Sequence, residues 1–168
     1  MELWDLYDAN RRPLGQKHLR GLPMKKGCYH LAVFVWVFDR YGRLLLTKRS
    51  PEKPAFPNLW ALTGGAVIAG ESSVHAVRRE LFEETGIRAR PSEFSMIDTY
   101  CRKNCFCDVY FLKKTVPLER LVMQEGETCD AKWVSRAEFE MMAKRKQIAQ
   151  PDVKRYAQLG SRLDEFFK

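Results

Sequence analysis

The segment that most constrains the fold of this 168-residue chain covers residues 64–87 and reads GGAVIAGESSVHAVRRELFEETGI. It predicts a glycine turn, a short connector and then one helix. Apolar residues recur at helical spacing in its second half, at Val74, Val77 and Leu81, which indicates a helix with one face in a core. The helix is expected to end at Gly86, because glycine suits the left-handed backbone position that follows a helix.

Three glutamates of the predicted helix, Glu80, Glu83 and Glu84, are spaced i, i+3 and i+4, so they share one face beside the apolar stripe. Such clustered carboxylates repel one another, and a hard cation would neutralise them. Mg2+ takes oxygen ligands, keeps several waters and typically uses one or two carboxylates with substrate phosphates. A solvated acidic face is the ordinary alternative. The glycine doublet and Glu71, at fixed offsets before the helix, favour the metal site.

The order of residues in this segment resembles the Nudix signature at every defined position. A glycine is followed by five residues, then Glu71, then seven residues, and then the string RELFEETGI, which starts at Arg79. The resemblance implies an α/β fold, a Nudix-type α/β/α sandwich with a mixed β-sheet. We expect one domain that spans residues 1–168.

The same resemblance implies an enzyme, a Nudix diphosphohydrolase (pyrophosphohydrolase) that uses Mg2+ or Mn2+. Its substrate would carry a diphosphate, typically in a nucleoside diphosphate derivative. By position in the motif, Glu83 and Glu84 are the expected main metal ligands, and Glu80 is a further ligand or the base that accepts a proton from water. The Gly64 carbonyl is an additional expected metal ligand. Arg79 is expected to hold the helix against the preceding loop.

Many Nudix enzymes carry a further glutamate on a distant loop, as a base or an extra ligand. Glu127, six residues before Trp133, fits that position best, and Glu125 is its rival. Both glutamates could equally be ordinary solvated loop residues. The choice between them, and the identity of the base, stay open from the sequence.

Outside the signature, the segments HLAVFVWVF and LLLTKRSPEKPAFPNLW are similar to the isopentenyl diphosphate isomerase branch of the superfamily. That resemblance assigns Arg49 and Lys53 to diphosphate binding, which suits paired cations in a proline-rich loop. A solvated loop is their equal alternative. His30 matches an isomerase metal ligand. The isomerase proton-donor cysteine and a metal-binding histidine, however, fall on Gly64 and Ala66.

Two glutamates that isomerases carry on a later strand are also missing, since residues 105–113 contain only Asp108 as an acid. An isomerase would need another proton donor, for which Cys28 and Cys101 are the obvious thiols. Hydrolysis is therefore the better interpretation, and isomerisation is the alternative. Trp60, Phe56 and Tyr100 could stack on a substrate base, although core packing explains each of them at least equally well.

The flanking segments predict the remaining elements. The run over residues 30–38 is apolar on both faces, which indicates a buried central strand. A hairpin is expected in about residues 1–20, and Ser135 with Glu138 forms a capping box that starts a helix. A terminal helix is expected over about 151–167. Further strands are expected at residues 43–48, 59–63, 94–101, 105–113 and 131–134.

Composition narrows the partners. The formal charge of +8, from 29 basic and 21 acidic residues, favours anionic partners. No apolar run approaches about 18 residues and no apolar leader is visible, so we expect no membrane segment and a cytoplasmic location. Five cysteines without zinc spacing suit a reducing compartment. A small-molecule diphosphate is the expected partner and no specific nucleic acid is, while a homodimer and a non-catalytic ligand-binding role stay open.

Overall fold

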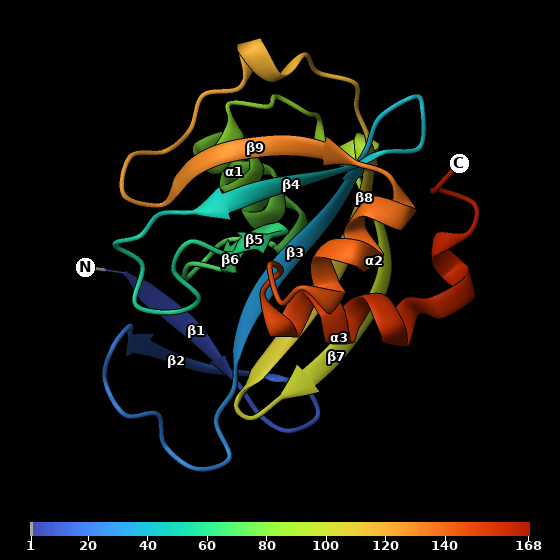
Figure 1. Cartoon of the computed structure of the whole chain (residues 1–168). Coiled ribbons are helices and arrows are strands. Elements are labelled where there is room, and N and C mark those ends of the chain that lie inside the picture. Colours follow the sequence, from blue (N-terminus) through green and yellow to red (C-terminus); the bar gives the residue numbers. More distant parts are fainter. Residues whose placement is uncertain (1) are drawn as a thin grey trace.

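The computed structural model describes residues 2–168 and places helices on both faces of a mixed sheet (Figure 1). The strands are β1 (Leu3–Tyr7), β2 (Pro13–Leu19), β3 (His30–Phe38), β4 (Leu44–Arg49), β5 (Trp60–Ala61), β6 (Thr63–Ala66), β7 (Ser95–Arg102), β8 (Cys105–Lys113) and β9 (Thr128–Val134). The α-helices are α1 (Ser73–Thr85), α2 (Arg136–Lys144) and α3 (Gln150–Leu159), with 3-10 turns at Pro91–Glu93, Leu118–Arg120 and Gly160–Leu163. The predicted α/β sandwich is confirmed.

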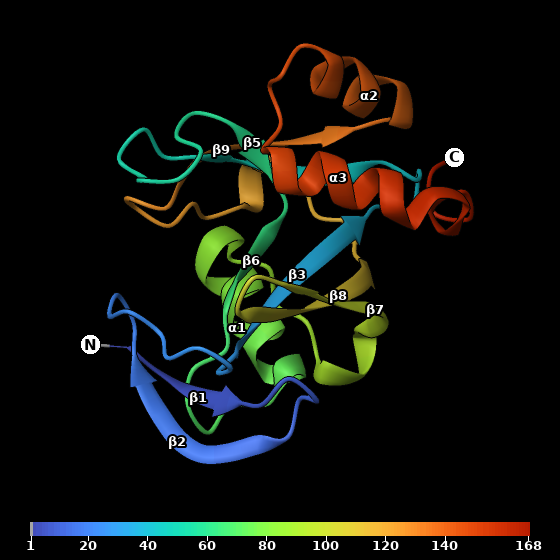
Figure 2. The same cartoon turned by 90° about the horizontal axis from the view of Figure 1, so that it is seen from below.

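β3 is the axis of the sheet. β8 runs parallel to β3 along its whole length, whereas β6 pairs antiparallel with its first half and β4 meets it at its end. Side chains alternate across a strand, so Val33, Val35 and Val37 enter the core beneath α1. Trp36 and Phe38 enter the other core, which α2 and α3 cover. Figure 2 shows this layering, with β3 between α1 and α3.

The terminal helix is shorter than the sequence predicted. α3 ends at Leu159, because Gly160 adopts φ 51° and ψ −125°, a conformation that glycine reaches without a side-chain clash. The chain continues as a 3-10 turn, and Leu163 and Phe167 are still buried in the same core as Leu159. The apolar spacing therefore correctly predicted which residues are buried, but it did not predict where the helix ends. Within residues 2–168, no helix is long and apolar enough to span a membrane.

The N-terminal hairpin of β1 and β2 forms a small sheet of its own that lies near the start of β3 (Figure 2). Tyr7 and Tyr29 exchange two backbone hydrogen bonds, of 2.8 and 2.9 Å, just before β3. The Ala69 amide, in the connector before α1, donates to the Leu3 carbonyl at 2.8 Å. The hairpin is thus bonded to two separate parts of the main domain.

A buried carboxylate ties the turn of this hairpin to the sheet. Asp108 on β8 is buried and accepts two hydrogen bonds from Arg11, at 2.7 and 2.6 Å. Ser73 and Thr99 donate to the same carboxylate at 2.5 and 2.8 Å. Burial acts to raise the pKa of Asp108, but these bonds outweigh burial and hold the pKa below its ordinary value. The acid on this strand therefore anchors the hairpin.

Candidate active site

A cavity of about 770 Å³ lies beside α1, the N-terminal hairpin and the turn between β7 and β8. Five carboxylates line it: Glu2, Glu80, Glu83, Glu84 and Glu127. Six cationic side chains line it as well: Arg20, Arg49, Lys53, Arg79, Arg102 and Lys103. Dense charge of both signs in one cavity suits a charged ligand with bound cations better than an apolar one.

The structure brings almost all of the predicted site residues together. The glutamates of α1 and Arg79, the proposed phosphate-binding pair Arg49 and Lys53, and Gly64 all line the cavity. Trp60 does not line it, because its ring packs on the core beneath α2 and α3 and lies 4.3 Å from the Lys132 ammonium. Glu127 lines the cavity, whereas Glu125 is exposed outside it. The geometry thus favours Glu127 over Glu125.

The glycine doublet is not the turn that the sequence suggested. Gly64 and Gly65 lie within β6, pair with β3, and have no positive φ. A Cβ atom on Gly65 would overlap the Glu80 carboxylate, and one on Gly64 would overlap the Val33 carbonyl oxygen. The doublet is needed because α1 and β3 approach the backbone of β6 so closely.

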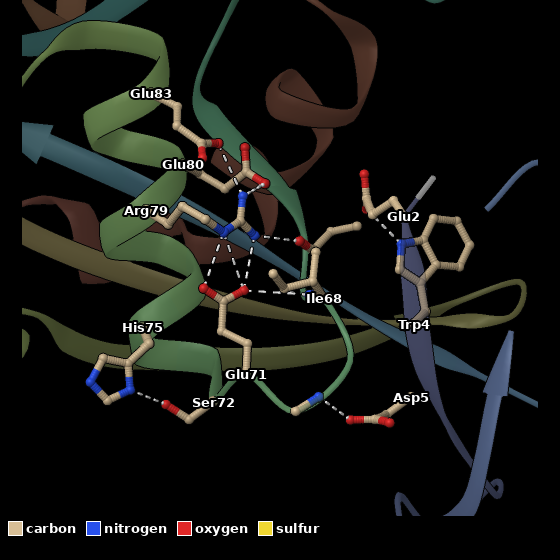
Figure 3. Close-up of polar contacts among 12 residues, drawn as sticks. Glu2, Trp4, Asp5, Ile68, Glu71, Ser72, His75, Arg79, Glu80 and Glu83 are labelled. Carbon is tan, nitrogen blue, oxygen red and sulfur yellow. Dashed lines mark hydrogen bonds and ion pairs between the residues drawn. The ribbon is translucent and has the colours of Figure 1, made fainter. Parts of the chain in front are cut away.

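Arg79 connects the helix to the loop that precedes it (Figure 3). Its guanidinium donates to Glu71 at 2.9 to 3.3 Å, to Glu80 at 2.8 Å and to Glu83 at 3.1 Å. It also donates to the Ala66 carbonyl of β6 at 3.0 Å. Burial lowers the pKa of Arg79, but the Glu71 and Glu80 contacts outweigh burial and raise it overall. One permanent cation therefore orients three of the signature carboxylates, namely Glu71, Glu80 and Glu83.

The carboxylates deeper in the cavity have too few cationic partners to favour their ionised forms. Burial raises the pKa of Glu80, and Arg79 offsets this only in part. Burial, together with the charge of Glu80, raises the pKa of Glu84 to about 8. Within residues 2–168, no three His, Cys, Asp or Glu side chains already form a metal-ligating group. Mg2+ nevertheless needs only one or two carboxylates, and a cation would relieve the repulsion at Glu84, so the donor set fits.

The loop before β9 brings Glu127 to the cavity. The Thr128 hydroxyl donates to the Glu84 carbonyl at 3.0 Å, which fixes the start of β9 against the end of α1. The Ser50 amide donates to the Glu127 carbonyl at 2.9 Å, and the Glu127 carboxylate forms an ion pair with Lys53. A carboxylate and an ammonium group that lie 74 residues apart in the chain thus meet at one edge of the cavity.

The other side of the cavity holds His30, which the resemblance to isomerases had pointed to, together with residues that the sequence did not identify. Trp4 and His30 stack on one another there, with ring centroids 4.1 Å apart. Arg102 and Cys105, at the turn between β7 and β8, also line it. The thiol in the cavity is therefore Cys105 and neither of the two that the sequence suggested. No local motif marks these residues, because non-local packing alone brings them together.

Comparison with known proteins agrees with this geometry. A family model described as the NUDIX domain matches residues 29–159. A Nudix hydrolase of Listeria monocytogenes is 37% identical over 143 residues, which cover 84% of this chain and 85% of that protein. An isopentenyl-diphosphate Delta-isomerase of Shigella flexneri is 31% identical over 118 residues, or 65% of this chain and 63% of that protein. A crystal structure from Deinococcus radiodurans, 21% identical, covers 99% of this chain and 100% of its own with a TM-score of 0.76.

Proposed function

This chain belongs to the Nudix family, and on that basis we propose that it is a Mg2+-dependent hydrolase of a diphosphate bond. Its substrate would be a nucleoside diphosphate-linked or related organic diphosphate. One observation supports the proposal above all others. The glutamates of α1 and Glu127, from a distant loop, line the same cavity as the cations Arg49 and Lys53.

The cation would be held by Glu83 and Glu84, with Glu80 and the Gly64 carbonyl as further donors. These are hard oxygen atoms, which Mg2+ and Mn2+ both accept. When bound, the cation supplies a Lewis acid and lowers the pKa of a coordinated water. Arg79 keeps Glu80 and Glu83 oriented, because it donates hydrogen bonds to both.

The remaining residues would bind the diphosphate and accept the proton of the attacking water. Arg49 and Lys53 supply charge-assisted hydrogen bonds to phosphate oxygens. Lys53 is paired with Glu127 in the structure. A phosphate that binds Lys53 would release the Glu127 carboxylate, which could then accept a proton from water. Glu80 is the alternative base.

Phosphate release from a substrate panel tests the proposal. Nucleotides, nucleotide sugars, dinucleoside polyphosphates and prenyl diphosphates would be incubated with about 5 mM Mg2+, well above a typical weak Mg2+ site. Each reaction would be run with and without added pyrophosphatase. We expect turnover of one substrate class, abolished by a chelator and restored by Mg2+. If no substrate in the panel released phosphate, the proposed hydrolase function would be wrong.

Isomerisation of an allylic diphosphate is a second candidate, and one observation favours it. Cys105 lines the cavity, and its contact with Cys107, together with burial, raises its pKa, so the thiol stays protonated as a proton donor must. Product analysis separates the two reactions, because isomerisation releases no phosphate.

The proposal includes a cytoplasmic location, since all five cysteines are free thiols.

A further inference from the structure

The two ends of the cavity differ in chemistry. One end holds the glutamates of α1 with Lys53, and the other holds a half-buried aromatic pair beside the hairpin. In that pair the Trp4 indole lies on the His30 imidazole, with ring centroids 4.1 Å apart and planes 14° from parallel. Near-parallel aromatic rings form a platform that a further flat ring can extend.

The Trp4 ring is held in place before any ligand arrives. Its indole N–H donates to Glu2 at 2.7 Å, and the second Glu2 oxygen accepts from Arg20 at 2.6 Å. His30 is the first residue of β3, and its backbone amide donates to the Asn104 carbonyl at 3.0 Å. A ligand ring that stacks here would therefore immobilise few additional rotamers, which favours binding.

This end of the cavity is too polar for an isoprenoid chain. Arg20, Arg102 and Lys103 line it, and neither Arg102 nor Lys103 forms a salt bridge with any residue in the described range 2–168. An alkyl chain would desolvate these cations without giving them a partner. A heterocyclic base instead offers acceptor atoms to arginine and an aromatic face to the indole.

One ligand can reach both ends. Figure 3 shows Glu2 and Trp4 on the hairpin, across from Glu80 and Glu83 on α1. Glu2 and Trp4 line the same cavity as Glu80 and Glu83, so the two ends belong to one continuous space. A cavity of about 770 Å³ is also within the range that encloses drug-sized ligands.

We propose that the hairpin end is a nucleobase subsite, where the base of the substrate stacks on the Trp4–His30 pair while its diphosphate lies at the glutamates. This inference rests on the proposed function and narrows its substrate class to nucleotides, so that prenyl diphosphates are excluded. Trp4 takes the stacking role that the sequence suggested for Trp60.

Calorimetric binding of matched probes tests the subsite. AMP, GMP, CMP and UMP would be compared with ribose 5-phosphate, which carries the same phosphate and sugar but no base. None of these probes contains a diphosphate bond, so binding is measured in Mg2+ without turnover. We expect at least one nucleotide to bind about tenfold or more tightly than ribose 5-phosphate, as base stacking on an aromatic side chain allows.

The ratio of the two affinities is the readout, because it does not depend on how much of a variant is folded. Trp4→Ala should bring the ratio close to one, and Trp4→Phe should retain most of it. Trp133→Phe, which alters an indole outside the cavity, is the matched control. A ratio near one in the wild-type protein, or a ratio that Trp4→Ala leaves unchanged, would overturn the inference.

The experiment also separates this inference from the proposed function. If no diphosphate is hydrolysed but nucleotide binding still depends on Trp4, the hydrolase proposal fails and the subsite stands. If diphosphates are hydrolysed but the base adds nothing to binding, the hydrolase proposal stands and the subsite fails.

Discussion

The two walls of the cavity are built by different means. The wall that we propose to be catalytic, called the catalytic wall below, is local, since β6 and α1 follow one another within residues 63–85 and α1 carries Glu80, Glu83 and Glu84. The opposite wall gathers segments that are far apart in the chain, namely the hairpin, the start of β3 and the turn after β7. Carboxylates that must keep fixed distances from one another fit on one helix. A surface that contacts the organic part of a substrate is built from several segments, and each segment can differ in sequence without altering the glutamates.

Each wall has its own charged anchor. On the catalytic wall Arg79 joins the connector, β6 and the helix face through Glu71, Ala66 and Glu80. On the other wall Asp108 joins the hairpin turn to β7, β8 and the start of α1. The comparison predicts that damage to the first wall removes turnover, while damage to the second changes stability and substrate choice.

The largest expected effect is on the catalytic wall. Glu83→Gln and Glu84→Gln should each lower turnover by at least about a hundredfold, because a Lewis acid contributes several kcal/mol to such reactions. The melting temperature of Glu84→Gln should change little at pH 7 in the absence of metal, since a neutral amide replaces a carboxyl whose pKa is raised to about 8 and which is therefore mostly protonated. Rates at saturating Mg2+ and thermal melting measure the two effects. Wild-type turnover in both variants would contradict the assignment.

The glycine doublet offers a paired test of close approach. Gly64→Ala should destabilise the protein, because its Cβ would meet the Val33 backbone, which cannot move alone. Gly65→Ala should keep most of the stability and still lower turnover more than tenfold, because its Cβ would displace the Glu80 carboxylate. Thermal melting and initial rates measure both. Equal loss of stability in the two variants would show that Glu80 is not the group displaced.

Glu127 and Glu125 form a matched pair in one loop. Glu127→Gln should lower turnover by about a hundredfold, the low end of what a positioned base contributes. Glu125→Gln should leave turnover unchanged, since that side chain is exposed outside the cavity. Initial rates as a function of pH would measure the difference. A larger loss in Glu125→Gln would reverse the assignment.

Local features of the fold were predictable from the sequence. Gly86 adopts φ 72° and its amide donates to the Phe82 carbonyl at 2.8 Å, which confirms the predicted helix end. Ser135 and Glu138 form the predicted capping box of α2. β3 is buried on both faces, as its apolar run predicted. Each of these depends on residues a few positions apart, where spacing alone sets the geometry.

The rest of the site could not be predicted from the spacing of residues in the sequence. Trp4 and His30 stack although 26 positions separate them, and no spacing rule links a hairpin to the strand that it lies against. Trp60 was a candidate for stacking on a base only because it is aromatic, and its ring packs against the core beneath α2 and α3. The glycines of β6 looked like a turn because glycine serves turns and close approaches equally. Only the packing of α1 on β6 decides between the two.

The smallest expected effect concerns the anchor of the second wall. Asp108→Asn should lower the free energy of unfolding at pH 7 by about 1 kcal/mol, because the amide replaces a charged acceptor but keeps some hydrogen bonds. The partner Arg11 is one-third exposed, so solvent weakens the pair. Asp164→Asn, at an exposed ion pair with Arg136, is the matched control and should cost less than about 0.5 kcal/mol.

The stability difference between wild type and Asp108→Asn should depend on pH, in a direction set by the pKa of Asp108. The pKa of Asp108 lies below its ordinary value of 3.8 in the folded protein, so its contribution to stability is present above that pH and is lost as pH falls through the folded pKa. The gap between wild type and Asp108→Asn should therefore narrow below about pH 4. Urea unfolding curves from pH 7 to pH 3 measure it, and a constant gap would mean that packing, not charge, anchors the hairpin. Turnover per folded molecule should change little, because the carboxylates of α1 keep their own anchor at Arg79.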